Sequence, residues 1–439
     1  MSPDAIVIGG GFAGLAAASA LAEQGARVLV LEARPGLGGR ASTFTDPATG
    51  ERVDNGQHVL FGCYHQTFRF LRRIGAESSL RLQPHLAIGV VDRDGRASRM
   101  ACPSLPPPLH LAAGVLRWNA PGWRDRIAVL GIRRAVSRAR PDETVRQWLV
   151  RHGQTARLIE LLWEPLAVAA LNQSIEVAAA PPFARVLRDL FGGDPRDAAL
   201  AMPLVPLDEL YALPAKAYIE ARGGEVRTGA PATVECGSPS AAARVRVRDL
   251  EIEAATIVCA VPWHALPGTI EQAPAGLSAV LRNAEATAAS PIVTVNLWLD
   301  RAVTDEPFLG LPGRTMQWIF DKRLLIGARA SHLSLVSSGA DGVVGLTNEA
   351  IVALATAEVR DALPPSRDAI VLRAQVVREK RASFSVAPDQ PPRPSTRTDV
   401  RGLFLAGDWI DTGLPATIEG AVISGHAAAE AALRTEALD

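Results

Sequence analysis

The order of apolar and polar residues at the start of the chain predicts a strand, a tight turn, a helix and a second strand. Residues 5–8 are apolar, and the glycine-rich run GGGFAG follows them at once. An alanine-rich segment comes next and predicts a helix from about Gly14 to Gln24, which Gly25 ends in a left-handed cap. A second apolar run then leads to Glu32. This alternation is typical of an α/β domain with a parallel sheet.

Later segments continue the same pattern. We expect a helix at 208–222 and strands at 225–228, 256–261 and 403–408, the last ending in an acid. Alternating segments between residues 291 and 347 predict a mainly antiparallel sheet instead. The α/β segments therefore lie toward both ends of the chain and enclose an inserted unit.

The spacing of the first glycines indicates a dinucleotide site. Gly9 permits a tight turn, Gly11 lets the backbone approach a pyrophosphate, and Gly14 lets the helix pack closely on the strand. The helix N-terminus then directs its amides and its positive dipole end at the phosphates. Glu32 follows Gly14 by 18 residues, where a carboxylate accepts hydrogen bonds from both ribose hydroxyls and disfavours a 2′-phosphate. We therefore expect an adenine dinucleotide other than NADP.

Residues 76–200 have a different character. A proline-rich stretch precedes an apolar run from Leu109 to Trp118, and the segment from Arg117 to Arg140 holds seven arginines against one acid, Asp125. One interpretation is a membrane-surface patch with Trp118 and Trp123 at the headgroup level. The other is a solvated, arginine-rich helical face, because the apolar positions form no clean stripe. The pattern alone leaves both interpretations open.

Composition excludes several classes of function. The 439 residues suffice for two or three cores, and the formal net charge of zero argues against a nucleic-acid binder. Four widely spaced cysteines without a CxxC pair favour a reducing compartment and no structural zinc. His58, Cys63 and His65 are close in sequence but lack a fourth ligand, so we expect no metal site. The first strand begins at about Asp4 and no run of 18 apolar residues occurs, so we expect neither a signal peptide nor a membrane span. The expected location is cytoplasmic, with peripheral attachment to the cytoplasmic membrane.

The turn beyond the second strand distinguishes between nicotinamide and flavin dinucleotides. Its sequence, GLGGR at residues 36–40, resembles the extension found in flavin-dependent amine oxidases, polyene desaturases and their relatives, the GR2-type flavoproteins, which bind FAD. The resemblance covers essentially the whole chain. It implies a Rossmann-like FAD-binding domain built from residues 1–75, 201–265 and 396–439. A helical, membrane-facing subdomain at 76–200 and an α+β substrate domain with an antiparallel sheet at 266–395 are inserted in it.

The same resemblance assigns roles in FAD binding. Arg40 would face the pyrophosphate, although a solvated loop arginine is the alternative, Val226 would lie against the adenine, and Asp408 would bind the ribityl chain. Thr417 and Ile418 would open the last helix at the pyrimidine edge, where a helix N-terminus stabilises a reduced flavin. The full candidate set is Gly9, Gly11, Ala13, Gly14, Glu32, Arg34, Gly39, Arg40, Gly56, Val226, Gly407, Asp408, Thr417 and Ile418. No cysteine follows Cys259, so the FAD is expected to be non-covalent.

Two motifs narrow the resemblance within this superfamily. Residues 54–65 (DNGQHVLFGCYH) and 406–420 (AGDWIDTGLPATIEG) look most like the squalene-associated flavoproteins of bacterial hopanoid synthesis, the hydroxysqualene dehydroxylases. This resemblance implies an oxidoreductase in which reduced FAD removes an allylic hydroxyl from a long-chain isoprenoid. Such a reaction needs a proton donor, and the candidates are His58 and Tyr64, although a histidine beside a glycine often caps a turn and a tyrosine often packs. The external electron donor is not identified by the sequence.

Three other functions stay open. A polyene desaturase would move hydride in the opposite direction, which the sequence does not fix. An amine oxidase is less favoured because the expected strand 291–299 lacks the lysine typical of that family. The lysines of the chain are Lys216, Lys322 and Lys380. A non-enzymatic prenyl carrier, similar to GDP-dissociation inhibitors, would not need the complete FAD site that Glu32, Arg40 and Asp408 indicate.

Overall fold

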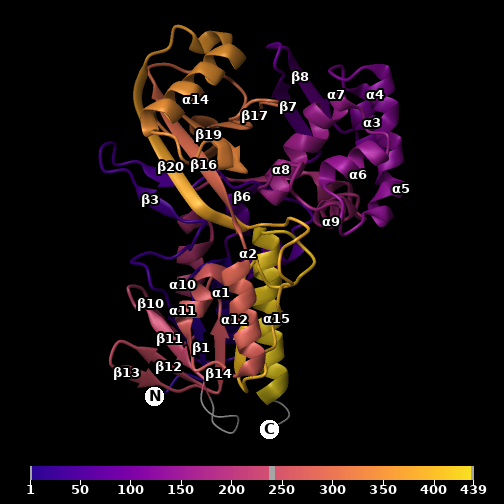
Figure 1. Ribbon diagram of the computed structural model, residues 1–439. Coiled ribbons are helices and arrows are strands. Elements are labelled where there is room, and N and C mark those ends of the chain that lie inside the picture. Colours follow the sequence, from indigo (N-terminus) through magenta and orange to yellow (C-terminus); the bar gives the residue numbers. More distant parts are fainter. Residues whose placement is uncertain (1, 237–242, 437–439) are drawn as a thin grey trace.

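The computed structural model describes residues 2–236 and 243–436 of the 439-residue chain. In this structure, short strands from both ends of the chain meet in one five-stranded sheet (Figure 1). Its strands, in spatial order, are β10 (Glu225–Arg227), β2 (Val28–Leu31), β1 (Ala5–Ile8), β14 (Thr256–Cys259) and β21 (Leu403–Leu405). All neighbouring pairs are parallel. The predicted α/β domain, assembled from discontinuous segments, is confirmed.

Helices α1 (Phe12–Glu23) and α15 (Ile418–Glu436) pack side by side on this sheet (Figure 1). Their approach is close, since a Cβ atom added at Gly425 would lie 2.2 Å from the carbonyl oxygen of Ala13. A Cβ atom at Gly14 would lie 1.9 Å from the carbonyl oxygen of Gly9, so α1 also lies close to the preceding turn. The helix expected at 208–222 is a π-helical turn, Asp208–Ala212, followed by α10 (Leu213–Glu220).

A seven-stranded sheet forms the second layer of the molecule (Figure 1). Its strands, in spatial order, are β20 (Val371–Phe384), β16 (Ala289–Leu299), β19 (Ser331–Ser338), β18 (Trp318–Asp321), β17 (Phe308–Gly310), β7 (Ala87–Val91) and β8 (Ala97–Ala101). Only the β17–β7 pair is parallel. The prediction of a mainly antiparallel sheet is therefore confirmed, and α14 (Asn348–Ala362) packs against β16 and β20.

The segment 76–200 is not purely helical, which corrects the sequence-based expectation. Its strands β7 and β8 complete the edge of the seven-stranded sheet, because residues 87–91 are apolar and gain a hydrogen-bonded partner there. Two further strands, β6 (Leu80–Leu82) and β9 (Leu200–Pro203), form a small sheet with β5 (Leu60–Phe61). The limits of the predicted domains stay a prediction.

The helices of this segment gather beside β7 and β8 (Figure 1). They are α3 (Leu109–Arg117), α4 (Trp123–Ala128), α5 (Ile132–Ala135), α6 (Val145–Arg151), α7 (Ala156–Leu158), a π-helical stretch (Ile159–Trp163), α8 (Glu164–Leu171) and α9 (Ala180–Leu190). In the described ranges, 2–236 and 243–436, no helix has the length and apolar character needed to cross a bilayer.

The membrane-surface interpretation placed Trp118 at the headgroup level, and the structure contradicts that position. Its side chain is 2% exposed, and its indole Nε1 donates to Oγ of Ser98 on β8 at 3.0 Å. The ring belongs to the core because α3 packs against β8 just before this residue, which leaves it no surface position. Trp123, in contrast, is 67% exposed.

Candidate functional site

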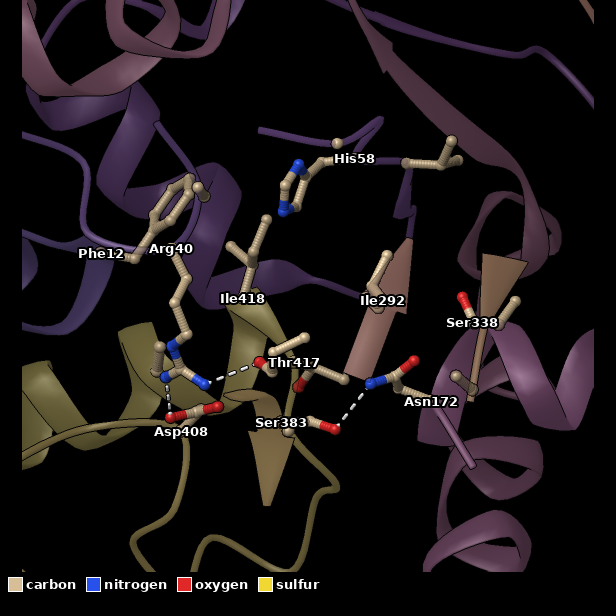
Figure 2. A pocket seen from close by; sticks show the side chains of 18 of the residues that line it. Phe12, Arg40, His58, Asn172, Ile292, Ser338, Ser383, Asp408, Thr417 and Ile418 are labelled. Carbon is tan, nitrogen blue, oxygen red and sulfur yellow. Dashed lines mark hydrogen bonds and ion pairs between the residues drawn. The ribbon is translucent and has the colours of Figure 1, made fainter. Parts of the chain in front are cut away.

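A cavity of about 1590 Å³ begins at the glycine-rich turn and continues between the helices of segment 76–200. Pockets for one small molecule usually measure roughly 300–1,000 Å³. This cavity therefore has room for a dinucleotide together with a second, long ligand. In Figure 2, Phe12, Arg40 and Asp408 stand at one side of it, and Asn172, Ile292 and Ser338 at the other.

Glu32 is fixed at the dinucleotide end by two backbone amides. Its Oε2 accepts from the amide of Gly10 at 2.7 Å, and its Oε1 accepts from the amide of Arg34 at 2.8 Å. The carboxylate is only 7% exposed and lines the cavity. Gly9 has φ +111°, and a Cβ atom there would lie 2.7 Å from the carbonyl oxygen of Ala260, so only glycine fits this turn.

Arg40 and Asp408, which we assigned to different parts of the cofactor, form an ion pair. The guanidinium donates to Oδ1 of Asp408 at 2.5 Å and to the carbonyl oxygen of Ala382 at 2.9 Å (Figure 2). Both residues line the cavity, and Asp408 is 5% exposed. The pair joins the first and the last segments of the predicted FAD-binding domain. Arg40 is therefore bonded and partly buried rather than a solvated loop residue.

Most of the candidate cofactor residues line the cavity, but two do not. Gly14 lies below it and acts through close packing alone. Val226 is 8% exposed, lies in the core around α1 and α10 and does not line the cavity, so its contact with the adenine stays a prediction. Its register on β10 opposite Val30 places it in that core. Residues 230–233 form the wall there instead.

The N-terminus of α15 reaches the cavity at Thr417 and Ile418, as expected. The next residue, Glu419, was not anticipated. Its carboxylate accepts from the amides of Gln66 and Thr67, both at 2.9 Å, and from Oγ1 of Thr67 at 2.6 Å. Glu419 therefore caps α2 (His65–Arg73) and fixes the two helix N-termini together. Burial raises the pKa of Glu419, although these hydrogen bonds oppose the shift.

Two other anchoring residues escaped the sequence analysis. The hydroxyl of Tyr211 donates to the carbonyl oxygens of Gly38 and Ala41, at 2.8 and 3.0 Å, and so fixes the GLGGR turn. Asn172 ends α8 in the left-handed region with φ 50°, and its Nδ2 donates to Oγ of Ser383 at 2.9 Å (Figure 2). An asparagine after an alanine-rich helix is a C-cap signal that could have been recognised.

Both candidate proton donors, His58 and Tyr64, line the cavity. Burial lowers the pKa of His58, helped by the nearby charges of Lys322 and Arg40, so its ring is neutral at neutral pH. Burial raises the pKa of Tyr64, which keeps its hydroxyl protonated. In the described part of the chain, the buried Nδ1 of His58 has no hydrogen-bond partner. Figure 2 shows His58 near Ile418, where the last helix begins.

The far end of the cavity is apolar and reaches the surface. Its walls come from β7, β8, α3, α5, α8, α9 and the π-helical stretch. Leu109 and Leu130 line the cavity and are 58% and 53% exposed, so they mark an opening. Arg133 lies on the same rim, and the exposed side chains of Trp123 and Ile127 are close to it in sequence.

The donor groups of the site do not form a metal centre. Over residues 2–236 and 243–436, no group of three or more His, Cys, Asp or Glu side chains is placed to hold a metal ion. The cysteines are free thiols, and three of the four are buried.

A family comparison agrees with this geometry. The family model described as flavin containing amine oxidoreductase matches residues 12–433. The chain belongs to this family and is an FAD-dependent oxidoreductase.

Individual relatives narrow the likeness. A hydroxysqualene dehydroxylase of Rhodopseudomonas palustris is 31% identical over 99% of both chains, and one of Sinorhizobium fredii is 30% identical over 97% of both. The zeta-carotene desaturase of Arabidopsis thaliana is 26% identical, covering 96% of this chain and 84% of its own. The resemblance to hydroxysqualene dehydroxylases predicted from the sequence is confirmed.

Solved structures agree on the fold. An oxidoreductase from Methanosarcina mazei superposes with a TM-score of 0.78, covering 97% of this chain and 99% of that chain, at 16% identity.

Proposed function

We propose that this protein removes the hydroxyl group of hydroxysqualene reductively and produces squalene. The observation that carries the proposal is the cavity, which connects the FAD-binding residues to an apolar tunnel with a surface opening. The curated relatives of nearly equal length that are at least 30% identical have this activity in their names. A long hydrocarbon with one polar group fits such a tunnel, because its only polar atom can lie at the flavin end.

Different residues of the site would serve different steps of this reaction. The allylic C–O bond breaks, the oxygen gains a proton and leaves as water, and a hydride forms the new C–H bond. Bound reduced FAD supplies the hydride and its two electrons. His58 or Tyr64 would donate the proton, because both hydroxyl and neutral imidazole donors face the cavity. The apolar walls exclude water from the reacting carbon.

The substrate is a membrane lipid, so we propose that the protein binds peripherally to the cytoplasmic face of a membrane. The exposed side chains of Leu109 and Leu130 lie at the cavity opening, and the exposed Trp123 and Ile127 and several arginines are close to Leu130 in sequence. Apolar side chains can enter the headgroup region while arginines contact anionic lipids. The substrate would then enter the tunnel without crossing water.

A polyene desaturase is the second candidate, because zeta-carotene desaturase is similar over nearly the whole chain. An amine oxidase is not favoured. The cavity-lining residue on β16, where that family carries its lysine, is Ile292. Lys322 does not line the cavity, and the lysine that does, Lys380, lies on β20.

The deciding experiment is anaerobic incubation of the flavin-reduced protein with 12-hydroxysqualene, followed by measurement of product mass. Loss of the hydroxyl oxygen with gain of one hydrogen, together with flavin reoxidation, is the expected result. Oxidised protein incubated with squalene and with a phytoene-type polyene tests the desaturase reaction. Desaturation of a polyene without consumption of hydroxysqualene would overturn the proposal.

A further inference from the structure

Lys322 is a buried charged residue beside the seven-stranded sheet. It is the first residue of α13 (Lys322–Ile326), directly after β18, and is 3% exposed. Its Nζ donates to Oδ2 of Asp54 at 3.1 Å and to Oε1 of Gln57 at 2.9 Å. A buried ammonium needs an anionic partner, and Asp54 meets that need. The hydrogen bond to Gln57 is therefore not needed to neutralise the ammonium group.

This bond determines which end of the Gln57 amide faces the cavity. An ammonium group has only donors, so it binds the carbonyl oxygen of Gln57 and not its NH₂ group. Gln57 lines the cavity beside His58. The only hydrogen bond of its Nε2 among the described residues is a long one, 3.4 Å, to the carbonyl oxygen of His58. The NH₂ group therefore has a free donor on the cavity side.

The segment that carries Gln57 is fixed to the seven-stranded sheet. It follows the hairpin of β3 (Thr43–Thr45) and β4 (Arg52–Asp54). Three acidic residues of this hairpin each contact the seven-stranded sheet or α13: Asp46 bonds to Arg373, Glu51 accepts from Nε1 of Trp298 at 2.6 Å, and Asp54 bonds to Lys322. The donor is therefore held on a rigid support, which a hydrogen bond to a bound ligand requires.

We propose that Gln57 donates a hydrogen bond to an oxygen acceptor bound in the cavity, and that Lys322 is the positioning residue which sets this polarity. The acceptor is a carbonyl oxygen of FAD or the hydroxyl oxygen of the substrate. The substrate alternative rests on the proposed function, whereas the FAD alternative does not. If Lys322 only fixed the hairpin to the sheet, its ion pair with Asp54 would suffice. The amide of Gln57 would then have no effect on the bound ligands.

The test compares three proteins. Gln57→Leu removes the donor. Asp54→Asn combined with Lys322→Met removes the ammonium group that orients Gln57. It also removes the carboxylate charge of Asp54, which would otherwise be buried without a partner. The asparagine keeps Oδ1, which accepts from Oγ1 of Thr43 and from the amide of Leu207. The third protein combines all three changes, and Lys216→Met, on the exposed face of α10, is the control. The readouts are FAD affinity, the visible spectrum and potential of bound FAD, and kcat and KM with 12-hydroxysqualene.

The proposal expects Gln57→Leu and the charge-free pair to cause the same loss, about tenfold or more, in one readout. Their combination should add nothing, because both remove one hydrogen bond. A change in FAD affinity, spectrum or potential identifies FAD as the acceptor. An unchanged spectrum with altered kcat or KM for the hydroxylated substrate identifies the substrate.

Two results would overturn the proposal. One is a Gln57→Leu protein with wild-type FAD affinity, spectrum, potential and kinetic constants. The other is losses that add in the combined protein, since Lys322 would then not act through Gln57. If the wild-type protein does not convert hydroxysqualene, the proposed function fails. The FAD readouts then decide on their own, and unchanged values overturn the proposal.

Discussion

The two ends of the cavity are lined by different kinds of chemical groups. The cofactor end depends on backbone atoms and a few charges, such as the turn at Gly9, the amides on Glu32 and the Arg40–Asp408 ion pair. The substrate end consists of apolar side chains from two strands and several helices. Phosphates require backbone amides at close range, whereas a hydrocarbon requires only space without water. The cofactor end should therefore tolerate little change, and the substrate end should tolerate much.

The largest effect is expected from Gly14→Val at the cofactor end. Its Cβ atom would overlap the carbonyl oxygen of Gly9, and backbone cannot rotate away as a side chain can. We expect loss of bound FAD and a lower melting temperature, measured by the flavin-to-protein ratio and by calorimetry. Gly36→Val is the control, because a Cβ atom there meets nothing within 4 Å. Full flavin occupancy in Gly14→Val would show that this end is less rigid than its geometry implies.

His58 lies where the two ends meet, and His58→Phe should separate chemistry from binding. If the ring donates the proton, turnover should fall about 10²-fold or more while the flavin spectrum stays unchanged. Burial and the charges of Lys322 and Arg40 lower the pKa of His58, so the ring stays neutral when the pH falls through 6.5. The contribution of His58 to the rate should therefore be constant down to that pH and change only below it. Wild-type turnover in this variant would leave Tyr64 as the candidate.

Asp408→Ala tests the charges of the cofactor end. It removes the anionic partner of Arg40 and an oxygen that lines the cavity. The dissociation constant of FAD should rise about 10- to 100-fold, the usual effect of losing a charge-assisted hydrogen bond. Asp411→Ala is the control, since the carboxylate of Asp411 is 61% exposed in its ion pair with Arg393. Equal effects of the two substitutions would argue against a specific role for Asp408.

The same difference between the two ends explains what the sequence could predict. The strands of the parallel sheet, the turn at Gly9 and the start of α15 were predicted because each requires particular residues at fixed spacing. Trp118 was misplaced because a short apolar run does not reveal which side of its helix is buried. Val226 alternates with the exposed Glu225 and Arg227, a pattern that predicts a buried side chain rather than one at the cavity.

Long-range polar contacts were the second kind of omission. Lys322 and Asp54 are 268 residues apart, and Glu419 and Thr67 are 352 apart. Each of these groups reads as an ordinary surface residue in sequence, and only the fold brings the partners together. Gln57 was quoted within a motif but had no role, since its role depends on Lys322.

Ala169→Trp should narrow the substrate end without affecting the cofactor. Ala169 lies on α8, lines the cavity and is exposed toward it, so the indole can enter the tunnel without displacing core residues. We expect unchanged FAD content and a loss of about tenfold in kcat/KM for the long substrate, which corresponds to about 1.4 kcal/mol. Ala353→Trp, on an exposed position of α14 outside the cavity, is the control. If FAD content fell as well, the two ends would not be independent.

The smallest effect is expected at the surface opening, where the arginines decide between a membrane patch and a solvated face. Arg126 is unsuitable for this test because it donates to the carbonyl oxygens of Pro121 and Leu116. Replacement of Arg124, Arg133 and Arg134 by serine should weaken binding to anionic vesicles severalfold, an effect that added salt should abolish.

Turnover of detergent-dispersed substrate should change little in this variant, because only Arg133 of the three lines the cavity, at its rim, and the FAD site is intact. Serine at the exposed Arg282, Arg329 and Arg360, outside segment 76–200, provides a control of equal charge. Equal loss of vesicle binding in both variants would reveal a general charge effect. Unchanged and salt-independent binding in the first variant would favour the solvated face. A selective loss, in contrast, would place the membrane at the cavity opening. It would also explain why the substrate end has no sequence motif, because a fluid lipid surface needs no residues at fixed spacing for its recognition.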